Sequence, residues 1–492
     1  MKTTGMKRNL CILLAAVLTG CGAAGCSEGT SQEETASAVQ SVTPEASAEP
    51  EAAEPEDVRG AVSDDLPERD FDGYKFSILT YSPNTYQAEE MNGDVVVDAI
   101  YERGVKLADR FNVDVISVAS PGINELDAEL KRSVTAGDNA YDLAVPHQIT
   151  SGPGFITGHC IRDWKDVPYI NPEKPWWNQS INETISIKGT QFYMAGYITM
   201  PTPFCMFINK DYIRNYGFDD IYATVREGKW IFDRMTSMTR QVVADLDGDG
   251  KMTENDQYGI SFNNDNNTLN FMYASGIQSV ILNEEGMPEP NVFTDKMVSL
   301  VEKMHDLVYN DSQTLFTDYN NQAVLGTGGF TAGRIMIKCG GVGDLAGLRE
   351  SEIDLGVIPY PMWDEEQDGY HTHVDAWNGM LCIPITAPDL ERTGIVTEAM
   401  AAETWKYVIP AYYDVALGTK YVRDEESAEM LDIIFDGVVY DFGYIFDNWK
   451  GCTWTIVRVV QSGGTDVASY WKSVSKIVDK HYKKLYEAVE NG

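Results

Sequence analysis

Residues 74–79 read YKFSIL, residues 113–116 read VDVI and residues 141–145 read YDLAV, and these three strand patterns decide the fold class. Two helical patterns, over 95–111 and 123–135, separate them. An alternation of strand and helix predicts a parallel sheet with helices on its faces. The sequence therefore predicts an α/β fold.

Polar and aromatic side chains follow these strands at the edge where such a sheet binds ligands. In open α/β sheets, ligands bind beyond the carboxyl ends of the strands. Tyr81 and Asn84 follow the first predicted strand, and His147 and Gln148 follow the third. We therefore expect the four side chains to face a ligand as a set. For any one of them, a place in the core or on the surface is an equally good explanation.

A second α/β unit begins near Tyr197, and the sequence contains no internal repeat. Its first predicted strand covers 204–208 and is followed by helices. The further strands are expected at 334–337, 355–358 and 380–384, and the helices at 211–216, 231–243, 395–408, 426–434 and 465–488.

The composition is that of a folded, acidic protein. The chain has 492 residues, of which 43% are hydrophobic and 11% aromatic, and this is enough for two or three packed units. Its formal net charge is −37. A field of this sign repels phosphate backbones, so we expect no nucleic-acid partner.

The N-terminus has the pattern of a bacterial lipoprotein signal. Three basic residues precede an apolar run at 10–18 that is too short to span a bilayer. The next residues, Leu18-Thr19-Gly20-Cys21, resemble the lipobox, in which the cysteine receives a lipid after cleavage. We therefore expect residues 1–20 to be a signal peptide and Cys21 to be lipidated. The alternatives are a plain secretory signal and lipidation at Cys26.

A linker is expected between the lipid and the folded body. Residues 21–68 are rich in Ala, Ser, Glu, Thr and Pro and contain almost no large apolar side chains. Such a segment cannot bury enough surface to offset its ordering entropy, so we expect it to be a disordered, acidic tether. The sequence thus predicts an extracytoplasmic protein, lipid-anchored to the outer face of the bacterial cell membrane.

The five cysteines of the predicted body form neither a zinc motif nor a redox motif. We expect buried thiols at these positions, because the sequence gives no pairing for them. They are Cys160, Cys205, Cys339, Cys382 and Cys452.

The segment 245–256, which reads DLDGDGKMTEND, has the oxygen spacing of a calcium-binding loop. Calcium takes six to eight oxygen ligands, which an EF-hand loop supplies around a sharp turn, here at Gly250. The last position is an aspartate, as it is in dockerin loops. The EF-hand loop has a glutamate at this position. A single loop of this kind predicts a structural Ca²⁺ ion, and an acidic surface turn is the alternative. The predicted ligands are Asp245, Asp247, Asp249, Lys251 through its carbonyl, Thr253 and Asp256.

Five motifs resemble, in order, those of the extracellular solute-binding proteins of ABC importers, in particular the carbohydrate-binding family 1 type. They are Ala136-Gly137-Asp138 with the strand at 141–143, the segment 207–211, Gly228-Lys229-Trp230, the segment 330–336 and the segment 356–361. Longer segments at 98–103, 175–178 and 423–427 resemble a clostridial branch of these proteins.

The resemblance implies a two-lobed, periplasmic-binding-protein-like (type II) fold with a hinge and an interlobe cleft. It places 69–197 and 357–412 in lobe one, and 198–356 and 413–492 in lobe two. The three crossings between the lobes are then expected near Tyr197, Gly356 and Tyr412.

The expected cleft is rich in rings and polar groups. Aromatic rings stack on the apolar C–H faces of sugars, and amides and carboxylates bind their hydroxyl groups. Tyr197 at a crossing and the loop residues Asp375, Trp377 and Asn378 therefore join the four strand-end residues as expected ligand contacts. Trp377 is the best candidate for a stacking ring.

The resulting hypothesis is a substrate-binding lipoprotein of an ABC importer. It would capture a neutral or weakly charged sugar or oligosaccharide and deliver it to a membrane permease, without being an enzyme. The sequence has no GxSxG, HExxH or phosphate-loop motif. The alternatives are a surface glycosidase or lyase that acts on polysaccharide, and a peptide receptor on the same fold.

Overall fold

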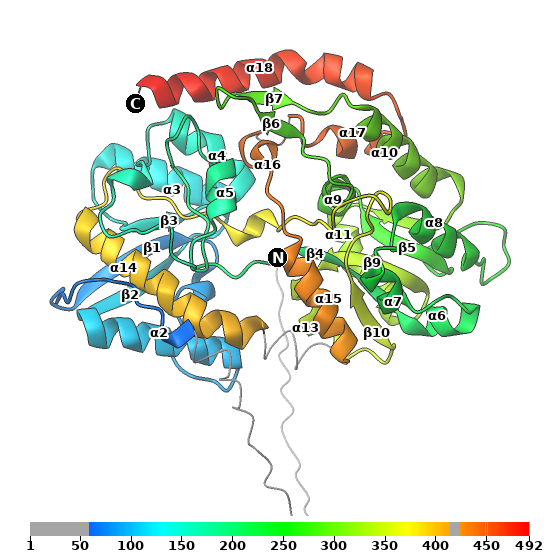
Figure 1. Cartoon of the computed structure of the whole chain (residues 1–492), viewed down its shortest axis with the longest axis horizontal. Coiled ribbons are helices and arrows are strands. Elements are labelled where there is room, and N and C mark those ends of the chain that lie inside the picture. The colour runs from blue at the N-terminus through cyan, green and yellow to red at the C-terminus, as the bar shows by residue number, and fades with distance from the viewer. Residues whose placement is uncertain (1–58, 414–423, 448, 450, 492) are drawn as a thin grey trace, which may run out of the picture. The chain divides into compact units, whose positions relative to one another are not determined.

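Three parallel strands form the sheet of lobe one in the computed structural model, which describes residues 59–413, 424–447, 449 and 451–491. The central strand β1 (Tyr74–Thr80) pairs with β2 (Val113–Ala119) on one side and with β3 (Leu143–Val145) on the other. The predicted parallel sheet is thus confirmed, with all three carboxyl ends at one edge (Figure 1).

Helices cover this sheet, and the sequence explains where the longest of them begins. The Asp94 side chain accepts hydrogen bonds from the backbone N–H groups of Val96 and Val97, at 3.0 and 3.3 Å, and so caps the first turn. The helices of lobe one are α2 (Val95–Phe111), α3 (Ile123–Ala136), α4 (Gln148–Thr157), α5 (Gln179–Thr184) and α14 (Leu390–Glu403).

The sheet of lobe two is mixed and has the order β10-β4-β9-β5-β8. Strand β4 is antiparallel to both of its neighbours, whereas β5 is parallel to both of its own. The strands are β4 (Phe204–Asn209), β5 (Tyr258–Asn263), β8 (Thr314–Thr317), β9 (Ile335–Gly341) and β10 (Leu355–Ile358). A small separate hairpin pairs β6 (Val280–Leu282) with β7 (Pro288–Pro290).

The longer helices that follow Asn209 pack around this second sheet or extend from it. They are α6 (Lys210–Tyr216), α7 (Ile221–Arg226), α8 (Phe232–Gln241), α9 (Asn266–Ala274), α10 (Asp295–His305), α15 (Glu425–Asp436), α16 (Phe442–Phe446), α17 (Thr455–Gln461) and α18 (Val467–Asn491). None of the helices in the described ranges is long and apolar enough to cross a membrane.

The predicted crossing near Gly356 is wrong, because the chain stays with lobe two for longer. Strand β10 continues to Ile358 and pairs with β4. The indole N–H of Trp230 then donates to the carbonyl of Pro359 at 2.9 Å, and the Thr372 hydroxyl donates to the carbonyl of Phe204 at 2.7 Å. The boundary at 356/357 therefore moves to the loop that follows Val374.

The predicted strand at 380–384 is also wrong, since only isolated bridges form there. Leu381 bridges to Met194, and Cys382 bridges to Ala144 of β3. These single contacts attach the chain to lobe one after the crossing without a continuous ladder.

The predicted linker ends earlier than residue 68. Arg110 of α2 forms an ion pair with Asp64, and Val62 and Leu66 pack against the core of lobe one. Residues 59–68 are therefore part of the folded body. Residues 1–58, with the predicted signal peptide and Cys21, lie outside the described residues.

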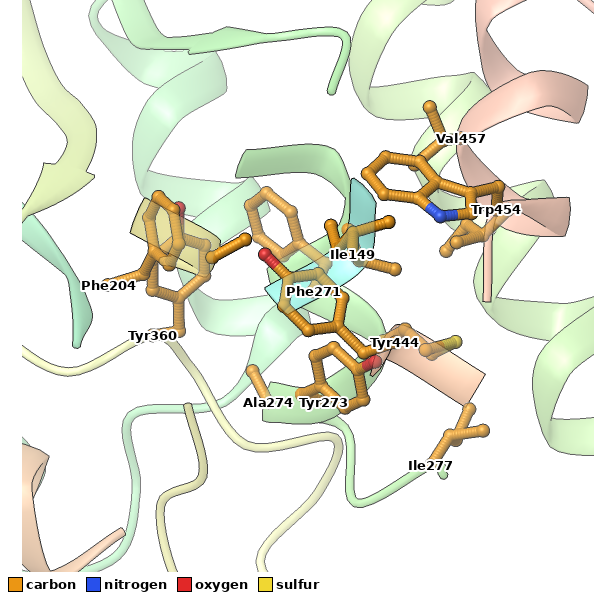
Figure 2. Close-up of a cluster of buried hydrophobic side chains, with 14 of the residues drawn as sticks. Ile149, Phe204, Phe271, Tyr273, Ala274, Ile277, Tyr360, Tyr444, Trp454 and Val457 are labelled. Atoms are coloured by element: carbon orange, nitrogen blue, oxygen red, sulfur yellow. The ribbon is translucent and has the colours of Figure 1, made fainter. Parts of the chain in front are cut away.

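The C-terminal region contacts both lobes, although the sequence placed 413–492 in lobe two alone. Helices α16 and α18 both pack against α4 of lobe one, and α18 also packs against α17 (Figure 1). Ile149 of α4 belongs to one buried cluster with Tyr273 of α9 and with Trp454 (Figure 2). The cores of the two lobes are thus continuous on this side.

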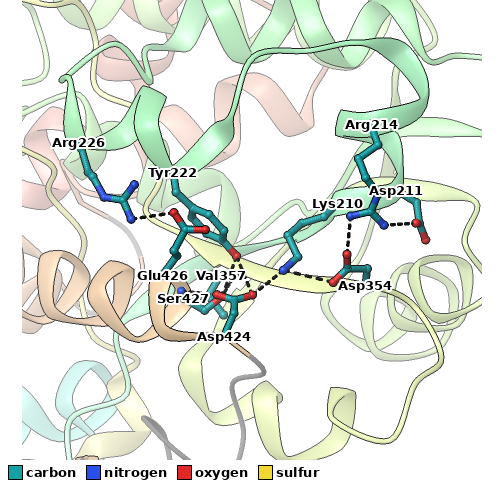
Figure 3. Close-up of polar contacts among 10 residues, drawn as sticks. All are labelled: Lys210, Asp211, Arg214, Tyr222, Arg226, Asp354, Val357, Asp424, Glu426 and Ser427. Carbon is teal, nitrogen blue, oxygen red and sulfur yellow. Dashed lines mark hydrogen bonds and ion pairs between the residues drawn. The ribbon is translucent and has the colours of Figure 1, made fainter.

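The start of α15 is fixed to lobe two by charged side chains. Lys210 at the start of α6 pairs with Asp354, at 3.2 Å, and with Asp424, which caps α15 through the Ser427 N–H (Figure 3). This contact holds the start of α15 on lobe two, and Tyr412 and Tyr413 already pack against the core of that lobe.

Candidate functional site

The loop after Val374 places an aromatic ring where the lobes meet. Asp375 caps the short 3-10 turn 376–378 by accepting a hydrogen bond from the backbone N–H of Trp377 at 2.9 Å. Gly379 has φ +60°, and a Cβ there would lie 2.6 Å from Cγ1 of Val145. Only glycine therefore lets the loop lie against the end of β3. The Trp377 side chain remains 50% exposed.

Lobe one supplies the rings that hold Trp377. The Tyr81 hydroxyl donates to the Trp377 carbonyl at 2.7 Å, and the two rings meet edge to face with centroids 5.1 Å apart. His147 approaches Trp377 at 5.7 Å and stacks on Trp449 at 5.9 Å. We call these four side chains the aromatic group. Three of its members were expected as ligand contacts from the sequence.

Lobe two contributes a cavity of about 350 Å³ beside Trp377, here called the cleft cavity. It lies at the carboxyl ends of β5 and β9, and its residues come from five separate parts of the chain. They include Thr202, Asn263, Asn267, Tyr319, Gln322, Lys338, Gly340, Gly341, Asp344, Asp375 and Trp377. The predicted residues Asp375 and Trp377 of the crossing loop therefore line this cavity of lobe two.

Apolar side chains stand exposed at this cavity. Tyr319 is 51% exposed, about as much as Trp377. Val324 is 67% exposed in the π-helical turn η4 (Gln322–Gly326) without lining the cavity, whereas Gln322 of the same turn lines it. Large apolar side chains are usually buried, so exposed ones that gather at a cavity indicate a binding surface. π-Helical turns are also frequent at functional sites.

The cavity contains one ion pair, between Lys338 and Asp344, and one further carboxylate, that of Asp375. Lys338 is buried, and its Nζ lies 2.7 Å from Oδ2 of Asp344. Asp375 has no basic partner among the described residues. Burial raises the pKa of Asp375 to about 6, against the hydrogen bond from Trp377, and the nearby carboxylates of Asp265 and Asp344 add to the rise.

Three further predicted residues lie on the other side of the crossing loop. Gln148, Tyr197 and Asn378 line a smaller cavity of about 90 Å³. Within the described residues, Oε1 of Gln148 and Nδ2 of Asn378 are buried without a hydrogen-bond partner. The side-chain amide oxygen Oδ1 of Asn378 accepts a hydrogen bond from the Thr202 hydroxyl at 2.7 Å. These three residues line the smaller cavity and do not line the cleft cavity.

Two predicted strand-end residues differ in their surroundings. His147 is buried and caps α4, since its Nδ1 accepts a hydrogen bond from the Thr150 N–H at 3.3 Å. Burial lowers the pKa of His147 to about 4, so the ring is neutral at pH 7. Asn84 is exposed in the 3-10 turn 83–85 and lines neither cavity.

Several residues of the cavity were missed from the sequence. Tyr319 and Gln322 follow β8, and Lys338 and Asp344 lie in or just after β9. The rule that ligands bind at the carboxyl ends of strands would have found the first pair, but β8 was not predicted. Trp449 could not be found in this way, because it follows a helix.

The predicted calcium loop brings three carboxylates together. Asp245, Asp247 and Asp249 are exposed, and one oxygen of each lies within 4.8 Å of the others. Gly250 has φ +82°, as the sharp turn requires. Asp256 instead accepts hydrogen bonds from the N–H groups of Leu246, at 2.8 Å, and Thr253, at 2.7 Å.

The loop therefore fits a hard cation at its first three predicted ligands, and its last aspartate closes the turn through backbone hydrogen bonds. The Lys251 N–H donates to Oδ1 of Asp249 at 2.8 Å, and the Thr253 hydroxyl donates to Asp256 at 3.1 Å. The carboxylates of the loop thus already order its backbone.

No protein-family model matches the sequence, and no curated protein matches it significantly. Solved structures match over most of their length. UgpB from Mycobacterium tuberculosis, in complex with glycerophosphocholine, has a TM-score of 0.57 at 13% identity, with 83% of this chain and 99% of that chain covered.

Two further structures agree. The galacto-N-biose-/lacto-N-biose I-binding protein of the ABC transporter from Bifidobacterium longum has a TM-score of 0.57 at 12% identity, with 84% and 98% covered. The ABC substrate-binding protein Lmo0181 from Listeria monocytogenes, in complex with cycloalternan, has a TM-score of 0.53 at 13% identity, with 83% and 99% covered.

The chain therefore has the two-lobed fold of ABC-transporter substrate-binding proteins, as the sequence predicted. At such low identity the likeness establishes the fold alone. The side chains at the cleft indicate the class of ligand.

Proposed function

We propose that this protein is the substrate-binding component of an ABC importer and captures a sugar or oligosaccharide between its lobes. The observation that carries the proposal is the cleft cavity, where Trp377 and Tyr319 stand half exposed beside a set of polar side chains. Sugars need this combination of flat apolar surface and hydrogen-bonding groups.

The polar side chains of the cavity can bind hydroxyl groups. Asn263 and Asn267 offer amide groups, and Gln322 is 6% exposed with an Nε2 that has no partner among the described residues. Oε1 of Gln322 is held by the hydroxyls of Ser261 and Thr317, at 3.1 and 2.8 Å. The amide is therefore fixed in orientation, which favours selective recognition.

The rival functions are tested by what happens to the bound molecule. Two of the structural neighbours named above are described as binding proteins, which supports a receptor without catalysis. A receptor binds its ligand reversibly and releases it unchanged, whereas a glycosidase or lyase consumes it.

We also propose that the protein belongs to the carbohydrate-binding family 1 type and to its clostridial branch, on the strength of the sequence resemblance. For its localisation, we propose that the protein is lipid-anchored through Cys21 to the outer face of the cell membrane. Lipid labelling of wild type and of Cys21→Ser tests the anchor. Equal labelling of both proteins would contradict it.

We also propose that the loop 245–256 binds a structural calcium ion. The support is the convergence of Asp245, Asp247 and Asp249 around the turn at Gly250, since carboxylate oxygens are the ligands that Ca²⁺ prefers. The loop lies outside both cavities, so the ion would stabilise lobe two rather than contact the sugar.

The test of the main proposal is isothermal titration calorimetry of the protein against a panel of neutral, amino and acidic saccharides of several linkages. We expect one saccharide to bind per protein molecule. Chromatography of the recovered ligand should show it unchanged. Cleavage of the saccharide would support the enzyme, and binding of peptides without any saccharide would support a peptide receptor.

A further inference from the structure

The charges around the cleft cavity do not balance. Three carboxylates belong to this region: Asp344 and Asp375, which line the cavity, and Asp265, which lies between the lining residues Asn263 and Asn267. The basic side chains that act on these carboxylates among the described residues are Lys338 and Arg458.

Of the two basic side chains, only Lys338 forms an ion pair with one of these carboxylates, and Arg458 acts at a longer distance. Lys338 pairs with Asp344 at 2.7 Å, and Gly340 makes room for the pair, because a Cβ there would lie within 3 Å of both charged groups. Arg458 acts on Asp265 and opposes the rise of its pKa. Among the described residues neither Asp265 nor Asp375 forms an ion pair, so the region keeps an excess of negative charge, and Asp375 is the unpaired carboxylate that lines the cavity.

Asp375 is held in place with one oxygen committed. Its Oδ1 accepts the hydrogen bond of the Trp377 N–H at 2.9 Å. A half-buried carboxylate is costly unless a cation pairs with it. The exposed ring of Trp377 follows in the same loop, and that of Tyr319 lines the same cavity. Rings beside a carboxylate form the surroundings that attract a cation.

We propose that the sugar captured in the cleft carries a protonated amine, which pairs with Asp375 beside the rings of Trp377 and Tyr319. This inference rests on the proposed function and names the chemical class of its ligand. The ammonium group would form a charge-assisted hydrogen bond with the carboxylate. The hydroxyl groups of the same sugar would bind amides such as that of Gln322, whose Nε2 has no partner among the described residues.

The same charge excludes other classes of sugar. A sugar phosphate or a uronic acid would bring a second negative charge to Asp375 and Asp344, and this repulsion disfavours binding. A neutral sugar can enter, but it leaves the carboxylate without a cation. The cavity should therefore rank amino sugars above neutral sugars and neutral sugars above acidic ones.

The experiment compares matched saccharides by calorimetry. Each saccharide that binds in the panel is measured beside the analogue that differs only at one position, with an amine, an N-acetyl group or a hydroxyl. Oligomers of glucosamine, N-acetylglucosamine and glucose with the same β-1,4 linkage form one such series. We expect the amine form to bind at least tenfold more tightly at low salt, with the difference reduced at high salt.

The variant Asp375→Asn should remove this preference, measured as the ratio of the affinities for the amine and the hydroxyl form, and Glu365→Gln, an exposed change outside the cavity, should keep that ratio. If neutral or N-acetylated members bind as tightly as the amine, the inference of an amine ligand is wrong, but the proposed function of a sugar receptor is kept. A preference that persists in Asp375→Asn would overturn the role of Asp375. If no saccharide of any charge binds, the proposed function itself fails.

Discussion

Trp377 is the residue on which sugar binding should depend most. Its backbone is fixed by Tyr81 and by the cap of Asp375, so its side chain can be changed without loss of these two hydrogen bonds. We predict that Trp377→Ala weakens saccharide affinity about tenfold to hundredfold. This follows from the roughly 1–3 kcal/mol gained when a large apolar side chain is buried.

Calorimetry with the best ligand of the panel measures the effect. Phe293→Ala is the control, because Phe293 is also strongly exposed, at 58%, but lines neither cavity. Equal affinities of wild type and Trp377→Ala would remove this ring from the site.

Glu398 is a second residue with a measurable effect, here on stability. It is fully buried in the core of lobe one and accepts hydrogen bonds from the indole N–H groups of Trp176 and Trp177, both at 2.9 Å. Burial raises the pKa of Glu398 to about 7 from the ordinary 4.5, against these hydrogen bonds. No basic side chain of the described residues pairs with it.

The raised pKa fixes the sign of a pH effect. Below pH 4.5 the group is protonated in both states, whereas near pH 7 and above it ionises in the folded protein at a cost of roughly 3 kcal/mol. Stability should therefore fall as the pH rises from 4.5 to 7. We predict that Glu398→Gln flattens the fall of the melting temperature between pH 4.5 and pH 7, because the amide cannot ionise.

Thermal unfolding monitored by circular dichroism across this pH range provides the measurement. Glu391→Gln, which changes an exposed carboxylate, should keep the slope of the wild type. An unchanged slope in Glu398→Gln would mean that the fall has another source, such as the buried carboxylates of Asp441 and Asp447.

Among the elements, α15 depends on a charged anchor. Lys210 is only 18% exposed and pairs with both Asp354 and Asp424 (Figure 3). Removing the lysine leaves the partly buried Asp424 without a cation among the described residues, whereas Asp354 keeps its ion pair with Arg214. We predict that Lys210→Met lowers the free energy of unfolding by roughly 1–3 kcal/mol, between the values for exposed and for buried pairs.

Urea unfolding measures this difference. The control is Lys229→Met, since Lys229 and its partner Glu227 are both exposed and their pair should contribute little. Similar losses in the two variants would show that Lys210 is not an anchor.

The calcium loop is an element with its own test. Because Ca²⁺ would bind the folded loop only, we predict a stabilisation of about 2.7 kcal/mol at a free calcium concentration a hundredfold above Kd. Asp247→Ala should abolish the rise in melting temperature, and the exposed change Asp219→Ala should keep it. A melting temperature that does not respond to calcium or chelator would make the segment an acidic turn.

Elements with a simple apolar pattern could be predicted from the sequence, and those with buried polar groups could not. Strands β1, β4 and β10 were expected because their side chains are largely apolar. Strand β5 has Ser261 and Asn263 at buried positions, where Gln322 and Asn267 satisfy them. Its Gly259 packs against the backbone of Thr239. Gln322 and Thr239 come from distant segments, so the local pattern does not indicate the strand.

The site was predictable where its residues follow a recognised strand or lie in a loop that combines aromatic and polar side chains. Tyr81, His147 and Trp377 do, and the fold brings them together. Tyr319 and Lys338 reach the cavity through the mixed order of the second sheet, in which β9 lies between β4 and β5. No local spacing in the sequence records that order.

For the whole molecule, the two lobes are joined in two ways. The crossing loop carries Trp377, and the C-terminal helices α16 and α18 pack against α4 on the other lobe. The cleft cavity therefore lies beside a hinge segment, and closure around a ligand should bring the lobes together. Saccharide capture by a rotation of this kind is the central claim.

Small-angle X-ray scattering tests that claim most directly. The protein is measured alone and with a saturating concentration of the best saccharide of the panel, and Trp377→Ala is measured at the same concentration. We predict a smaller radius of gyration for the wild type with saccharide, and a weaker contraction or none for the variant because less of it is bound. A saccharide that binds the wild type without any contraction would contradict capture between the lobes.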